Sequence, residues 1–169
     1  MMRASFVQAR ERVAFETADL VDLSWTPWRR IMLSARENIW TLVDAEDFPW
    51  LSENVWNVSW GKGCPWKKYA KRNVGPDRAT LRMHREITIL HDPRAERFMS
   101  THHVDHGNRN GLDNRWRERA GIPGNLGWAT PKQNAANRGA RADIPSLESI
   151  VLELLAALGP RPDIQEVPF

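Results

Sequence analysis

The sequence predicts an α+β fold: a small antiparallel sheet with short helices, then a strand–loop–strand–helix unit, then a C-terminal amphipathic helix. Three observations support this prediction. Short β-compatible runs in the first half of the chain are bounded by turn residues. A well-marked helix start follows a later run at Thr130. Apolar residues recur at helical spacing from Ser146 to Leu158, and Gly159 and Pro160 end that pattern.

The 169 residues divide into four parts of one domain, or of a small core with appendages. Residues 1–27 are an expected helical extension, with a helix from Ser5 to Val21, and residues 28–95 carry the antiparallel sheet. The strands expected there cover 29–33, 38–43, 55–60, 66–73 and 79–83. Helices are expected at 45–55, with Asp44 as N-cap, and at 83–91. Residues 96–141 hold the strand–loop–strand–helix unit, and residues 142–169 hold the last helix and a loose tail.

The strand–loop–strand–helix unit begins with a β-compatible run after Phe98 that ends at His106. Strand alternation places His103 and Asp105 on one face and Val104 and His106 on the other. The following segment, GNRNGLDN, consists of residues that favour turns. A second short run extends from Asn125 to Thr130.

The helix of this unit has a predicted N-cap at Thr130, with Pro131 at the first helical position and Gln133 completing a capping box. Asn134 therefore lies in or just beyond the first turn. Asn137 and Arg138 lie one turn further on, on roughly the same face.

The polar residues of the unit have the chemistry that phosphodiester hydrolysis requires. A general base must activate water, and a cation must stabilise charge on the phosphate and the leaving oxygen. Asp105 and Asn134 offer hard oxygen donors suited to Mg²⁺ or Mn²⁺. His106 can take the proton if a hydrogen bond orients its other ring nitrogen, and we expect the region of Asn125 to supply that bond.

These residues resemble the HNH motif of His-Me finger endonucleases, in particular the phage and intron homing or nicking enzymes. The resemblance spans residues 28–140, and its specific matches are 105–106, 108, 110, 112–115, 125–126, 128, 130, 133–134 and 137. It implies a ββα-metal core around one divalent ion. His106 would be the general base, Asp105 and Asn134 the metal ligands, and Asn125 the residue that positions the base.

One feature departs from the resemblance, since His106 and Asn125 lie nineteen positions apart, several more than that subgroup usually has. The additional residues, around 116–124, indicate a loop enlarged at its tip. We expect its arginines to be able to reach DNA.

The charge is distributed unevenly, although the whole chain carries only +3. Residues 59–141 hold 17 Lys and Arg against 7 Asp and Glu, and acidic residues dominate the flanks. Such a basic block is typical of a face that binds a polyanion, here double-stranded DNA. The candidate DNA contacts are Lys62, Lys67, Lys68, Lys71, Arg72, Arg115, Arg117 and Arg119. The alternative for the run from Lys62 to Arg72 is a solvated edge strand protected by lysines.

Three further residues are possible auxiliary members of the site. His103 shares the Asp105 face and is a candidate neighbour of the metal or a phosphate contact. Asn137 is either an auxiliary residue or a helix-surface residue, and Arg138 lies beside it.

Several classes of protein are not expected. The single cysteine, Cys64, excludes a disulfide framework and a Cys-rich zinc site. No N-terminal apolar run is long enough for a signal peptide or a membrane span, so we expect a cytoplasmic, intracellular protein with no membrane partner. No small-molecule cofactor is expected, and the chain is a monomer or a homodimer.

The prediction is therefore a Mg²⁺- or Mn²⁺-dependent endonuclease of the homing or nicking type. One alternative is a non-catalytic DNA-binding module on the same fold. Another is a non-specific, toxin-like nuclease. Those relatives tend to bind metal through helix histidines, and the helix after Thr130 has none.

Overall fold

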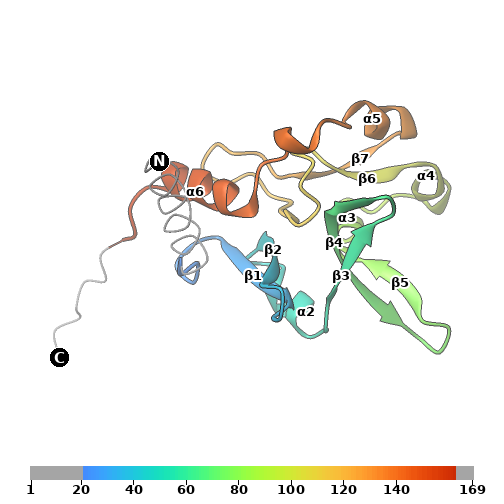
Figure 1. The fold of residues 1–169 in the computed structure, drawn as a ribbon, viewed down its shortest axis with the longest axis horizontal. Coiled ribbons are helices and arrows are strands. Elements are labelled where there is room, and N and C mark those ends of the chain that lie inside the picture. Colours follow the sequence, from blue (N-terminus) through green and yellow to red (C-terminus); the bar gives the residue numbers. More distant parts are fainter. Residues whose placement is uncertain (1–20, 163–169) are drawn as a thin grey trace, which may run out of the picture.

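The computed structural model describes residues 21–162, which form short helices and three separate antiparallel sheets (Figure 1). The fold is therefore mixed α+β, as predicted. The helix expected from Ser5 to Val21 lies outside the described residues, apart from its last position. Within the described range, no helix is both long enough and apolar enough to cross a membrane.

The first sheet pairs β1 (Trp28–Ser34) with β2 (Ile39–Asp44), close to the predicted hairpin. Helix α2 (Phe48–Ser52) follows and is shorter than predicted. Its N-cap is Asp47 rather than Asp44, because Asp44 still belongs to β2. The buried Asp44 carboxylate instead accepts hydrogen bonds from two backbone N–H groups of the enlarged loop.

The second sheet has the order β3–β4–β5, formed by β3 (Asn57–Gly61), β4 (Cys64–Val74) and β5 (Ala79–Arg82). The predicted strands are confirmed here within a few residues at each end. The helix α3 (Met83–His91) begins directly after β5, as predicted, and packs on β4 and β5. The second sheet and α3 thus pack together as one unit of the fold.

The third sheet pairs β6 (His103–His106) with β7 (Leu126–Ala129), His106 lying opposite Leu126. Helix α5 (Pro131–Ala136) follows and packs against both strands. Its capping box is confirmed: the Thr130 side chain accepts from Gln133 N–H, and the Gln133 side chain accepts from Thr130 N–H. The prediction of a strand directly after Phe98 was wrong in its first half, because Glu96–Thr101 forms a helix, α4.

A single apolar core joins these elements. A short 3-10 turn (Arg141–Asp143) leads to α6 (Leu147–Leu158), which buries Leu147, Ile150, Val151 and Leu154 as its spacing predicted. The same cluster contains side chains of β1, β2 and α3. Figure 1 shows α6 and α5 at opposite ends of this assembly.

The turn segment 107–114 attaches the third sheet to the first and second. Leu42 N–H donates to Leu112 O at 2.9 Å, and Asn114 N–H donates to Leu42 O at 2.8 Å. Gly111 lies so close to β4 that a Cβ there would come within 2.4 Å of Lys68 O. The segment is therefore fixed between β2 and β4, immediately after His106.

Candidate active site

A cleft of about 720 Å³ lies between the β3–β4 hairpin, the start of α3 and strand β6. A smaller one of about 170 Å³ shares part of its wall. The predicted site residues in these walls are Lys62, Lys67, His103, Asp105, His106, Asn134, Asn137 and Arg138. The structure thus brings together the candidate base, both candidate metal ligands and five basic or polar neighbours from the β3–β4 hairpin, β6 and the region of α5.

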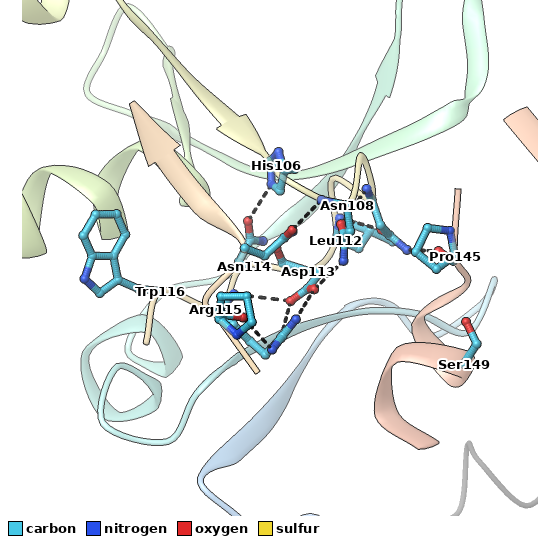
Figure 2. A network of polar contacts seen from close by, with 12 residues as sticks. His106, Asn108, Leu112, Asp113, Asn114, Arg115, Trp116, Pro145 and Ser149 are labelled. Atoms are coloured by element: carbon cyan, nitrogen blue, oxygen red, sulfur yellow. Dashed lines mark hydrogen bonds and ion pairs between the residues drawn. The ribbon is translucent and has the colours of Figure 1, made fainter. Parts of the chain in front are cut away.

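The His106 ring is held by a chain of hydrogen bonds, of which Figure 2 shows the bond to Asn114, and the direction of each bond can be assigned. The Thr41 hydroxyl donates to Leu112 O at 2.7 Å, so its oxygen accepts from Asn114 Nδ2 at 2.8 Å. Asn114 Oδ1 consequently lies toward His106, 3.1 Å from Nε2. Because an amide oxygen only accepts, Nε2 carries the proton and Nδ1 keeps the lone pair.

The charge state of His106 follows from its surroundings. The side chain is buried, and burial lowers its pKa below the ordinary value of 6.5. The hydrogen bond to Asn114 and the charges of Asp113 and Asp105 oppose that shift without reversing it. The ring is therefore neutral at pH 7 and can accept a proton at Nδ1.

The expectation that Asn125 contacts the His106 ring is wrong, since Asn114 occupies that place. Asn125 Nδ2 donates to Asp113 O at 2.7 Å, and Asn125 Oδ1 accepts from Asn108 N–H at 2.8 Å. Asn125 thus connects the two ends of the turn segment that carries Asn114. Its effect on His106 passes through that segment.

Asp105 is positioned by a residue of the following helix. Asp105 Oδ2 accepts from Asn137 Nδ2 at 2.8 Å, and the same Nδ2 donates to His106 O at 2.9 Å. Asp105 Oδ1 accepts from His106 N–H at 2.9 Å. The Asn137 side chain therefore contacts two of the candidate site residues and is not merely part of the helix surface.

The donor set fits a magnesium-type ion better than zinc. Asp105 and Asn134 line the same small cleft, and the Asn134 side chain makes no hydrogen bond within residues 21–162. In that range no group of three or more His, Cys, Asp and Glu side chains could hold a metal. One carboxylate and one amide oxygen suit Mg²⁺ or Mn²⁺, which retain several waters, whereas structural zinc requires four protein ligands.

No protein-family model matches the chain, and neither a curated protein nor a solved structure gives a significant match. The cleft and its hydrogen bonds are therefore what a functional proposal for this chain must rest on.

The predicted DNA contacts fall into two groups, the basic residues of the β3–β4 hairpin and the arginines of the enlarged loop. Lys62 and Lys67 line the main cleft, and Lys68 lies over the Trp60 ring at 5.2 Å on the same hairpin. Lys71 is further along β4, outside both clefts. Arg72 is engaged within the protein, donating to Asn54 Oδ1 at 2.8 Å.

The enlarged loop does not bring its arginines to the cleft. The prediction that Arg115 contacts DNA is wrong. The residue is 4% exposed and forms a two-pronged ion pair with buried Asp113, at 2.7 and 2.8 Å (Figure 2). Arg117 and Arg119 both pair with Glu46 instead. The loop is folded back onto the first sheet, where Asp44 Oδ2 accepts from the N–H groups of Trp116 and Arg117.

Proposed function

We propose that this chain is a divalent-metal-dependent DNA endonuclease of the HNH homing or nicking type. The observation that carries the proposal is the single tautomer of His106. A neutral histidine with its Nδ1 lone pair available lies in a cleft wall beside a carboxylate and an unpartnered amide oxygen. A fold that merely presents cations to DNA does not need that arrangement.

In the proposed reaction, His106 Nδ1 removes a proton from water as the water oxygen bonds to phosphorus and the bond from phosphorus to the 3′ oxygen breaks. The charge that develops on the ring is stabilised through Nε2–H and Asn114 Oδ1. Asp105 and Asn134 would hold a Mg²⁺ or Mn²⁺ ion, which supplies charge stabilisation on the phosphate and the leaving oxygen. Asn137 keeps the Asp105 carboxylate oriented for that role.

The positive side chains of the cleft would bind the substrate backbone. Lys62 and Lys67 approach from the hairpin and Arg138 from the residues after α5, so the two sides of the cleft are both basic. Phosphate contacts of this kind position the duplex and carry no base information. A chain with one such site is expected to cut one strand, and a double-strand break would require a second copy or a second encounter.

The decisive experiment is cleavage of a supercoiled plasmid. The parent should produce nicked circles in Mg²⁺ or Mn²⁺ and none in EDTA. His106→Ala should lower the rate by roughly 10²- to 10⁴-fold, the usual contribution of a general base. His102→Ala is the matched control, because His102 stacks on Phe98 outside the cleft. Equal rates for the parent and His106→Ala would refute the proposal.

The same assay separates the two alternatives. A non-catalytic DNA-binding module would retard the plasmid without nicking it in any metal. A toxin-like nuclease would cut a random plasmid everywhere and leave a smear, whereas a homing or nicking enzyme would cut at discrete positions. Mapping the nicks therefore decides between the two catalytic readings.

A further inference from the structure

A second buried histidine lies next to His106 in the cleft wall and has no part in the mechanism above. His84 is the second residue of α3, and its ring centroid is 5.0 Å from that of His106, with the planes at 79°. Tyr69 of β4 lies 5.8 Å from His84 and 5.9 Å from His106. All three rings line the main cleft.

The His84 ring nitrogens serve no contact within the protein. Neither Nδ1 nor Nε2 forms a hydrogen bond with any residue in the described range. Nδ1 is completely shielded, whereas Nε2 is not, so Nε2 is the nitrogen through which this ring of the cleft wall can bind a ligand. The residue is only 9% exposed. A buried imidazole with no hydrogen bond to the protein disfavours folding, and in native proteins such a group calls for a functional explanation.

The surroundings of His84 favour an anion. Arg82 and Arg85 flank it in sequence and line the same cleft, and Lys67 lines it from the hairpin. No side chain caps the N-terminus of α3, which begins one residue before His84. Burial lowers the His84 pKa well below 6.5, and two further effects add to the shift: repulsion from His106 when both rings are protonated, and the charges of Arg82 and Arg85. The free His84 ring is therefore neutral. A neutral imidazole still has one N–H to donate.

We propose that His84 is a second catalytic residue, which donates a hydrogen bond to a non-bridging oxygen of the scissile phosphate while His106 activates water. This role rests on the proposed nuclease function. The two rings are close enough to act on a single phosphodiester, and an oxygen of that group would be the hydrogen-bond acceptor for Nε2–H of His84. A donor fixed in advance at a site of developing negative charge stabilises the transition state more than the ground state.

The test uses two variants that differ in the ability to donate. His84→Phe keeps a ring of similar shape without nitrogen, and His84→Gln keeps an N–H donor. Single-turnover nicking of supercoiled plasmid should fall by about 10²- to 10³-fold in His84→Phe, as when one oxyanion donor is removed. His84→Gln should recover at least about tenfold of that loss. Binding of a 20-base-pair duplex in EDTA should change by less than about threefold, because the contact matters mainly in the transition state.

Thermal unfolding distinguishes this role from a structural one. The nitrogens make no contact in the fold, so His84→Phe should melt at or above the temperature of the parent. A melting temperature lowered by more than about 5 °C would show that the nitrogens serve the fold and would overturn the proposal. Nicking by His84→Phe within about threefold of the parent, or an equal loss in both variants, would overturn it as well.

The parent assay keeps the two proposals separable. Absence of nicking by the parent in Mg²⁺ and Mn²⁺ contradicts the nuclease itself. Nicking that persists unchanged in the His84 variants contradicts only the role of His84.

Discussion

The side-chain oxygen of Asn114 lies 3.1 Å from Nε2 of His106, and no other orientation of that amide satisfies its neighbours. The constraint comes from Thr41, 73 positions earlier in the chain, whose hydroxyl is already committed to Leu112 O. The tautomer of the proposed base is therefore set by the first sheet. The turn segment transmits that constraint because it is hydrogen-bonded to β2 on both sides of Asp113.

Substitution of Asn114 should change the orientation or the pKa of the His106 ring and leave the ring itself in place. Asn114→Leu deletes the acceptor and leaves the ring free to turn, so nicking should fall by roughly 10- to 100-fold. Asn114→Asp places a carboxylate beside the ring, which favours the imidazolium and raises the His106 pKa. In the parent, burial lowers that pKa below 6.5, so nicking should be constant at neutral pH and decline as the pH falls below 6.5.

Rates measured between pH 5 and 8 check this pair of variants. Asn114→Asp should move the acidic decline to higher pH, while Asn73→Asp, on the β4–β5 hairpin outside the cleft, should leave the profile of the parent. Identical profiles for Asn114→Asp and the parent would show that Asn114 does not control the base.

The two buried histidines should make stability depend on pH. Burial lowers the pKa values of both His84 and His106, so between pH 5 and 6.5 the unfolded chain binds more protons than the folded one. Their contribution to the free energy of unfolding is complete above pH 6.5 and is lost as the pH falls below it. The slope is at most about 1.4 kcal/mol per pH unit for each histidine.

Urea unfolding at pH 5, 6 and 7 measures that slope. His84→Phe removes one of the two titrating rings, so its free energy of unfolding should fall less steeply toward pH 5. Equal slopes in the parent and the variant would mean that His84 titrates alike in the folded and unfolded states.

Local rules predicted the elements that frame the site. The capping box at Thr130, the apolar spacing of α6 and the hairpins of β1–β2 and β3–β4 depend on residues a few positions apart. Helix α4 was missed because its support is not local: Ala95 provides no cap, and Arg85 of α3 donates to Met99 O at 2.8 Å. The β-propensity of the run after Phe98 was outweighed there by this tertiary contact.

The hydrogen bonds within the candidate site could not be predicted from the sequence, because they too depend on tertiary contacts. A sequence motif predicted Asp105, His106 and Asn134 as candidate site residues. That Asn114 rather than Asn125 contacts the His106 ring depends on how the turn segment lies against β2. Arg115 shows the limit of counting charges, since only the fold reveals that its side chain is buried in an ion pair with Asp113. The one signal in the sequence was the spacing: Arg115 lies two positions after the acidic Asp113, close enough for an ion pair.

Removing Arg115 should therefore damage the fold rather than weaken DNA binding directly. Arg115→Ala leaves the fully buried Asp113 without its cation, which should lower the free energy of unfolding by about 3–5 kcal/mol. Arg119→Ala breaks an exposed pair with Glu46 and should cost about 0–1 kcal/mol. Urea denaturation of both variants provides the comparison, and equal stabilities would restore Arg115 as a candidate DNA contact.

The hairpin lysines should bind phosphate and make DNA affinity depend on salt. Each phosphate contact releases a condensed counterion, so Lys62→Ala or Lys67→Ala should reduce the slope of log K against log salt by about one. Arg36→Ala removes the same charge from the exposed β1–β2 turn, away from both clefts, and should leave the slope unchanged. Fluorescence anisotropy with a labelled duplex in EDTA, between about 50 and 200 mM KCl, resolves a change of this size. If all three variants lose affinity equally and keep the slope of the parent, the lysines are a solvated strand edge and the duplex is held elsewhere.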